Sequence, residues 1–239
     1  MNPVSDTLSV RQVGTGPPLV LLHGLLVTGE MFDPLVDAWS ARYRLVIPDL
    51  PGPYPVDLLD RLDLPRAHVL GYSHGGTVAQ RLAYEHPDRV DRLVLACTYA
   101  CNRDSRRGRV EGWLSPWLLA TLGPVAMAGL AARAGGGPAL TRGQAAALRG
   151  MVVPGRRRAV AAYRELLDFD SRPWLARIAA PTLVVYGPDD RAVPRRHAET
   201  LAGAIPRAEL CAIGGGGHFL AWTHTARFAD AVARWLDRP

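Results

Sequence analysis

No stretch of this chain restricts its fold as tightly as a glycine-rich turn with the sequence GYSHGG at residues 71–76. An apolar run at 67–70 precedes the turn, and a helix-like run at 77–85 follows it. The spacing G-x-S-x-G between a buried strand and a helix is typical of a nucleophile elbow, a sharp turn in which larger neighbouring side chains would collide. The helix that begins there offers free backbone N–H groups to the Ser73 hydroxyl. We expect a reactive serine at position 73. The alternative is a glycine-rich turn without a chemical role, because G-x-S-x-G also occurs by chance.

Apolar runs that alternate with helical patterns indicate one α/β domain with a mainly parallel, doubly wound sheet. Strands are expected at residues 7–13, 19–22, 43–47, 67–70, 93–96, 181–187 and 208–213. Helices are expected at residues 29–40, 56–62, 77–85, 194–204 and 225–236. Three prolines at alternate positions predict a stiff loop at residues 49–55.

The alternation of strands and helices disappears between residues 98 and 180. Helical patterns near 141–150 and 156–168 remain, and a segment of this length inside a compact domain generally carries function. We predict an α/β core formed by residues 1–97 and 181–239, with a mostly helical lid at residues 98–180.

Residues 113–132 of this lid are uncharged over a length that could cross a bilayer. They contain Pro116, Gly123, Pro124 and Gly129, and basic residues flank them on both sides. These features favour a helix pair that covers a pocket and is broken near Gly123-Pro124, rather than a membrane span.

The basic charge carries little functional information. The formal net charge is +6, and all 28 basic residues are arginine, which indicates a coding bias. Arginine clusters at 106–109 and 156–158 could contact phosphates, but no aromatic residues are interleaved with them. We interpret the clusters as solvated faces and expect no nucleic-acid partner.

The cysteine content fits a reducing compartment. Cys97, Cys101 and Cys211 cannot all pair, and their spacing resembles no metal site, so we expect no metal and no other cofactor. The first residues lack the basic start and apolar core of an export signal, which predicts a cytoplasmic location.

A reactive serine needs a base to take its proton and an acid to orient that base. His218 follows the last expected strand, within the run GGGGHF, where glycines allow the loop to reach back over the sheet. His224 is the weaker candidate for the base because it lies in the approach to a helix. For the acid, Asp189 and Asp190 both follow the preceding strand, where open α/β sheets place their sites.

These motifs together resemble the α/β-hydrolase superfamily. The resemblance rests on LVLLHG at 19–24, GYSHGG at 71–76, PTLVVYGPDDRAVP at 181–194 and GGHFLAW around residue 218, and it covers nearly all of the sheet-forming chain. The order serine, aspartate, histidine is the one expected of this fold. The resemblance implies a helical lid after the sixth strand of the fold, and it selects Asp190 over Asp189 as the acid.

The resemblance also implies how the oxyanion is held. The backbone amides of Leu25 and His74 would stabilise a tetrahedral intermediate. Serine at position 73, rather than aspartate, disfavours the dehalogenase and epoxide-hydrolase branches. The chain departs from the family pattern in the shorter segment after Asp49 and in an N-terminal sheet edge with room for one clear strand.

The function predicted from these features is hydrolysis of a carboxylic ester or thioester of a small, mostly apolar substrate through an acyl-enzyme on Ser73, with His218 as base and Asp190 as acid. The same fold and triad also support lactone hydrolysis, carbon–carbon bond hydrolysis and cyclase or lyase steps. A non-catalytic ligand-binding member is a further alternative. We expect neither a membrane nor a nucleic acid as partner, and the sequence leaves the oligomeric state open.

Overall fold

The computed structural model describes residues 9–50, 55–102, 106–135, 139–152 and 156–238 of the chain. Its described strands form one sheet in the order β1-β3-β2-β4-β5-β6-β7. The strands are β1 Val10–Val13, β2 Pro18–Leu22, β3 Arg44–Pro48, β4 Ala67–Tyr72, β5 Val90–Ala96, β6 Thr182–Tyr186 and β7 Ala208–Ala212. β1 runs antiparallel to β3, and every other neighbouring pair of strands is parallel. The predicted mainly parallel α/β fold is confirmed.

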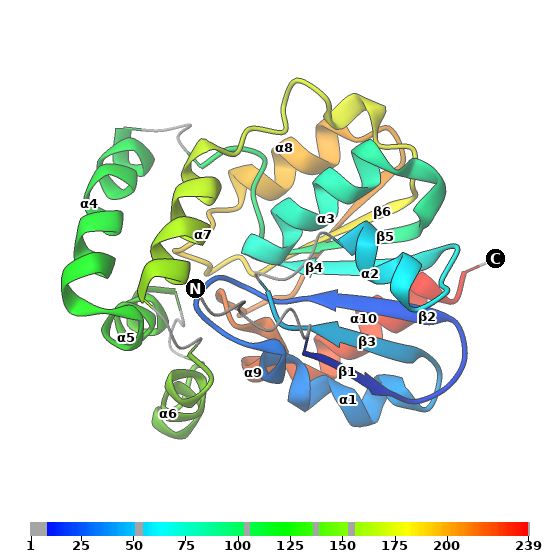
Figure 1. Ribbon diagram of the computed structural model, residues 1–239, viewed down its shortest axis with the longest axis horizontal. Helices are drawn as coiled ribbons and strands as arrows, with labels where there is room; N and C mark the ends of the chain where they lie inside the picture. Colours follow the sequence, from blue (N-terminus) through cyan, green and yellow to red (C-terminus); the bar gives the residue numbers. More distant parts are fainter. Residues whose placement is uncertain (1–8, 51–54, 103–105, 136–138, 153–155, 239) are drawn as a thin grey trace, which may run out of the picture.

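Helices cover both faces of this sheet (Figure 1). One face carries α2 Pro55–Arg61, α3 His74–Glu85 and α8 Arg196–Ala204, and the other carries α1 Asp33–Ser40, α9 Leu220–Thr223 and α10 Thr225–Leu236. Each layer buries its own apolar cluster. Trp39 and Phe228 lie in one cluster, and Leu59, Leu82 and Leu201 lie in the other. Burial on both sides explains why the central strands have continuous apolar sequences.

Three short 3₁₀ helices lie in the described core, and one of them corrects the bounds of an expected helix. They are η1 Gly29–Phe32, η2 Pro87–Arg89 and η3 Leu175–Arg177. The single helix expected at residues 29–40 is divided into η1 and α1, because Pro34 near the start of α1 has no N–H with which to continue a helical hydrogen-bond ladder. Similarly, α8 begins at Arg196, two residues later than expected.

Four further helices lie between β5 and β6: α4 Arg106–Leu122, α5 Pro124–Gly135, α6 Arg142–Gly150 and α7 Arg156–Asp168. They form a group beside one end of the sheet (Figure 1). The expected break at Gly123-Pro124 is present, since α4 ends at Leu122 and Gly123 has a φ of 84°. The family resemblance predicted this group after the sixth strand of the fold. In the described residues it follows the fifth strand, because the N-terminal edge of the sheet has one strand fewer than that prediction assumed.

Several other expectations can be compared with the described residues. No helix among them combines the length and hydrophobicity that crossing a bilayer requires. Cys97, Cys101 and Cys211 are all free. Part of the predicted proline-rich loop (residues 51–54) and the arginine side chains of the clusters at 106–109 and 156–158 lie outside what the structure describes.

Candidate active site

The turn between β4 and α3 holds Ser73 in a backbone conformation that L residues rarely adopt, with φ 52° and ψ −117°. Three hydrogen bonds fix this turn. The Ser73 N–H donates to the carbonyl of Ala96 at 2.9 Å, and the Ser73 carbonyl accepts from the N–H of Gly76 at 2.9 Å and from the Thr98 hydroxyl at 2.6 Å. A strained backbone conformation of this kind persists only where several surrounding interactions hold it, and such residues are concentrated at functional sites.

The two glycines of the elbow have no space for a side chain. A Cβ at Gly75 would lie 2.0 Å from the carbonyl oxygen of Leu22, and a Cβ at Gly71 would lie 2.4 Å from the carbonyl oxygen of Gly75. Strand β4, helix α3 and the end of β2 therefore approach one another at backbone distance. The collision predicted from the sequence is confirmed at both positions.

The structure brings His218 and Asp190 together beside this serine. His218 Nε2 lies 3.1 Å from Ser73 Oγ, and His218 Nδ1 lies 2.8 Å from Asp190 Oδ2. A carboxylate can only accept, so Nδ1 carries the proton it donates to Asp190, which leaves Nε2 free to accept from the serine hydroxyl. The three side chains follow β4, β6 and β7, at the carboxyl ends of parallel strands.

The adjacent aspartates have different surroundings. The Asp190 side chain is fully buried, and its Oδ1 accepts the N–H groups of Ala192 at 2.9 Å and Val193 at 2.8 Å. Asp189 is exposed, and its backbone N–H donates to Gly216 at 2.9 Å. The geometry therefore pairs Asp190, and not Asp189, with His218.

The other candidate base lies elsewhere. His224 Nδ1 is 2.9 Å from the Thr223 hydroxyl, and the position of a Cβ at Gly215 is 3.6 Å from His224 Nε2. The structure therefore pairs Ser73 with His218, while the imidazole of His224 contacts Thr223.

Tyr72 holds the loop that carries His218. Its hydroxyl donates to the carbonyl of His218 at 2.6 Å and accepts the N–H of Leu220 at 2.8 Å. The Tyr72 ring also meets the His218 ring edge to face, with centroids 6.1 Å apart. Tyr72 is 1% exposed, so its hydroxyl bridges two backbone groups that water does not reach freely.

The loop after β2 lies against the elbow. A Cβ at Gly24 would lie 3.5 Å from the Cβ of Ser73, and Leu26 has a φ of 67°. His23 stabilises this loop, because its Nδ1 lies 2.8 Å from the Gly24 carbonyl and its Nε2 accepts the N–H of Leu50 at 2.6 Å. This arrangement places the backbone of residues 24–26 next to the serine.

His74, the residue after the serine, and His23, which interacts electrostatically with it, have buried imidazoles in the neutral form. Burial lowers the pKa of His23, and it lowers the pKa of His74 to about 4, with His23 adding a smaller repulsive effect on His74. Desolvation disfavours the charged form of each ring. At neutral pH His74 therefore adds no positive charge beside Ser73.

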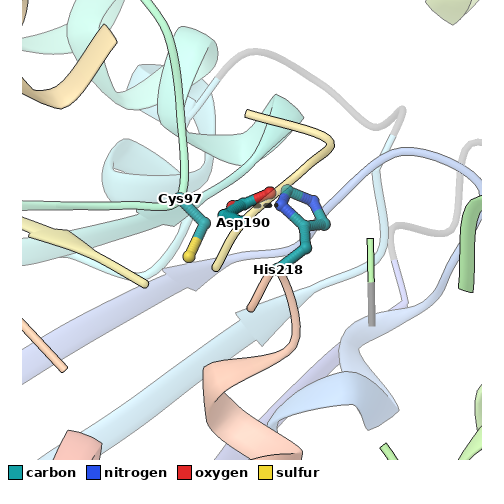
Figure 2. A group of neighbouring side chains, drawn as sticks. All are labelled: Cys97, Asp190 and His218. Carbon is teal, nitrogen blue, oxygen red and sulfur yellow. Dashed lines mark hydrogen bonds and ion pairs between the residues drawn. The ribbon is translucent and has the colours of Figure 1, made fainter. Parts of the chain in front are cut away.

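Cys97 lies beside the acid and the base (Figure 2). Ligand atoms of Cys97, Asp190 and His218 all lie within 4.8 Å of one another. These residue types can bind a metal ion, but the hydrogen bond between Asp190 and His218 already uses one atom of each. Burial and then the charge of Asp190 raise the pKa of the Cys97 thiol, so the thiol is protonated at neutral pH. The three groups fit a hydrogen-bonded acid–base pair with a neutral thiol at its side.

An apolar cluster borders the loop after β2. Tyr99, Leu166 and Val193 are buried together, and Leu25 packs against them. Leu166 belongs to α7, so the helical segment between β5 and β6 contributes to the surroundings of the site.

A family model described as the alpha/beta hydrolase fold matches residues 56–225. The chain belongs to the α/β-hydrolase family. Membership of that family, together with relatives named as esterases, identifies the chain as a hydrolase. The resemblance seen in the sequence motifs is confirmed.

Individual relatives are similar over most of this hydrolase. The chain is 30% identical over 256 residues to the pimeloyl-[acyl-carrier protein] methyl ester esterase of Chromobacterium violaceum, with 96% of this chain and 98% of that protein covered. It is 32% identical over 252 residues to the polyketide synthase ThaQ of Burkholderia thailandensis, covering 94% of this chain but only 12% of that protein. The crystal structure of an enol-lactonase from Burkholderia xenovorans LB400 matches with a TM-score of 0.86, 26% identity and coverage of 97% and 96%.

Several residues around the site were not predicted from the sequence. Tyr72 precedes the serine and is apolar enough to be read as part of the strand, so its hydroxyl gave no separate signal. Thr98 and Cys97 lie at the end of β5, far from Ser73 in the sequence, and only the pairing of β4 with β5 brings them to the elbow. A polar residue at the carboxyl end of the strand next to the nucleophile strand is the signal that could have found Thr98.

Proposed function

We propose that this hydrolase cleaves carboxylic esters or thioesters through an acyl-enzyme formed on Ser73. The observation that carries the proposal is the continuous hydrogen-bonded series Ser73 Oγ, His218 Nε2, His218 Nδ1 and Asp190 Oδ2, with distances of 3.1 and 2.8 Å. In this order a base reaches the nucleophile and an acid orients the base.

In the first half of the proposed reaction Ser73 Oγ attacks the substrate carbonyl carbon while His218 Nε2 takes the hydroxyl proton. The tetrahedral intermediate then collapses as His218 returns that proton to the leaving alcohol or thiol. Asp190 stabilises the imidazolium with Oδ2, while the N–H groups of Ala192 and Val193 hold its other oxygen. Water repeats the sequence on the acyl-enzyme and releases the carboxylic acid.

The developing oxyanion is assigned to the backbone amides of Leu25 and His74. Two observations support this assignment: the loop of residues 24–26 lies against Ser73, and His74 is the first residue of α3, where helix N–H groups have no partner within the helix. Two such donors typically contribute several kcal/mol to transition-state stabilisation, about 3 kcal/mol for each one removed.

Residues 98–180 are proposed to act as a lid over the acyl group. The cluster of Tyr99, Leu166 and Val193, with Leu25 against it, supports an apolar acyl chain, since two of its members lie within this segment. The names of the C. violaceum esterase and of the polyketide synthase relative support testing acyl groups that carrier proteins hold as thioesters. The enol-lactonase neighbour supports including cyclic esters.

The test is a panel of p-nitrophenyl esters, N-acetylcysteamine thioesters and lactones with acyl chains of increasing length. Wild type, Ser73→Ala and the control Ser40→Ala, at the end of α1 in the opposite layer, are compared. We expect Ser73→Ala to lower kcat by at least about a thousandfold and to keep its circular dichroism spectrum, with Ser40→Ala at the wild-type rate. Turnover by Ser73→Ala near that of wild type would refute the mechanism, and a wild type inactive on the whole panel would refute the proposed ester and thioester substrates.

A further inference from the structure

We propose that Gly135, the last residue of α5, positions His218 for catalysis, an inference that rests on the proposed role of His218 as general base. The N–H of His218 donates to the carbonyl of Gly135 at 2.9 Å. Gly135 is buried, and it belongs to the helical segment between β5 and β6 rather than to the sheet domain. One backbone hydrogen bond thus joins that segment to the residue that takes the serine proton.

The contact leaves little room for a side chain at position 135. A Cβ there would lie 3.1 Å from the Cβ of His218 and 3.2 Å from the Cβ of Ala192. Non-bonded carbon atoms prefer a separation of about 3.5 to 4.0 Å, so the neighbours would have to move apart by several tenths of an ångström.

The two neighbours belong to the two halves of the acid–base pair. Ala192 donates its N–H to Asp190 Oδ1, and His218 donates from Nδ1 to Asp190 Oδ2. A methyl group at position 135 would therefore push against both loops whose separation sets the hydrogen bond between acid and base. Gly135 is a positioning residue by this argument, since it acts through His218 and Ala192.

Further contacts hold the same helical segment in place around the site. The N–H of Thr28 donates to the carbonyl of Met151 at 3.0 Å, close to the loop after β2. The Gln144 side chain donates to the carbonyl of Trp222 at 2.6 Å, close to the His218 loop. Because Gln144 and Met151 tie the segment to both loops, the segment cannot easily shift to relieve a collision at Gly135.

The experiment compares Gly135→Ala with the matched control Gly129→Ala in the same helix. A Cβ at Gly129 would meet only the Cδ of Arg149, at an ordinary 3.6 Å. With p-nitrophenyl butyrate we expect Gly135→Ala to lower kcat about 10- to 100-fold while KM changes less than about threefold, because a misplaced catalytic group affects the chemical step. Gly129→Ala should keep the wild-type kcat, and melting curves should show that both variants are fully folded at the assay temperature.

A signal independent of activity separates this inference from the proposed function. The proton shared between His218 Nδ1 and Asp190 should give a downfield ¹H NMR resonance, identified by its loss in His218→Gln. We expect that resonance to shift or broaden in Gly135→Ala and to stay unchanged in Gly129→Ala. If wild type is inactive on every ester but the resonance responds in this way, the positioning contact stands while the proposed function fails.

Rescue provides a second check. Ala192→Gly removes one of the two carbon atoms that would collide, so Gly135→Ala/Ala192→Gly should regain part of the kcat lost by Gly135→Ala, measured against Ala192→Gly alone. The proposal is overturned if Gly135→Ala matches Gly129→Ala in both kcat and the NMR resonance. It is equally overturned if Gly135→Ala fails to fold, because the contact would then be structural.

Discussion

Replacing Tyr72 by phenylalanine removes one hydroxyl group from the interior of the hydrolase. That hydroxyl donates to the carbonyl of His218 at 2.6 Å and accepts the N–H of Leu220 at 2.8 Å. Leu220 is fully buried, and Tyr72 is 1% exposed, so water cannot readily replace the lost partner. The substitution therefore removes two hydrogen bonds and leaves two backbone groups unpaired.

The expected loss follows from those two groups. Two ordinary hydrogen bonds would contribute about 2 kcal/mol together, and stranding each buried partner raises the total toward about 2 to 5 kcal/mol. We take about 3 kcal/mol as the expected decrease in the free energy of unfolding of Tyr72→Phe. For a chain of this size that corresponds to a melting temperature lower by about 6 to 12 °C.

Urea unfolding followed by circular dichroism measures this loss, with Tyr43→Phe as the matched control. The Tyr43 hydroxyl donates to Asp237 at 2.6 Å, but Asp237 is one-third exposed and also pairs with Arg42. Tyr43→Phe should cost at most about 1 kcal/mol because its partner keeps other partners and water. A loss in Tyr72→Phe no larger than that in Tyr43→Phe would refute the reasoning.

Three other predictions follow from the site. Asp190→Asn should lower kcat by about 10³- to 10⁴-fold with little change in KM, because its amide would face His218 Nδ1 and favour the wrong tautomer; a fall of less than tenfold on a p-nitrophenyl ester would contradict this. The pKa of His74 is lowered to about 4 by burial and then by His23. Below pH 6.5 the unfolded chain therefore binds more protons at this residue than the folded chain, and stability decreases as the pH is lowered. Wild type should lose about 2 kcal/mol more than His74→Gln between pH 7 and pH 5, and parallel urea profiles for the two would exclude that origin. Thr98→Val removes the 2.6 Å hydrogen bond to the Ser73 carbonyl and should cost about 1 kcal/mol; an unchanged urea midpoint would show that this bond contributes nothing.

Buried parallel strands were the most predictable part of the fold, because burial on both faces leaves continuous apolar runs in the sequence. Strand β5 shows the limit of that signal. Its expected start was residue 93, but pairing of Val90 with Ala67 begins the strand earlier and includes Asp91 and Arg92, which are half-buried. Charged residues near the start of a strand interrupt the apolar pattern without interrupting the ladder of hydrogen bonds.

The candidate site was predictable where a residue of a reactive type lies in a loop directly after an apolar strand. Ser73 and His218 each lie in a glycine-rich loop after an apolar strand, and the structure places their reactive atoms 3.1 Å apart. The residues alone left Asp189 and Asp190 open, and only the family resemblance selected Asp190. The backbone of the turn gives the physical basis of that choice, because it buries the Asp190 carboxylate and leaves Asp189 exposed. The contact between Gly135 and His218 left no trace in the sequence, since it depends on how a helical segment packs against a distant loop.

The claim that Ser73 is the nucleophile is tested most directly by trapping the acyl-enzyme. The hydrolase is mixed with a p-nitrophenyl ester, quenched in acid within milliseconds and digested for mass spectrometry. We expect the peptide that contains Ser73 to gain the mass of the acyl group, fragmentation to locate that mass on the serine, and Ser73→Ala to gain nothing. Rapid turnover with no adduct under any quench time, or an adduct on a different residue, would contradict the account.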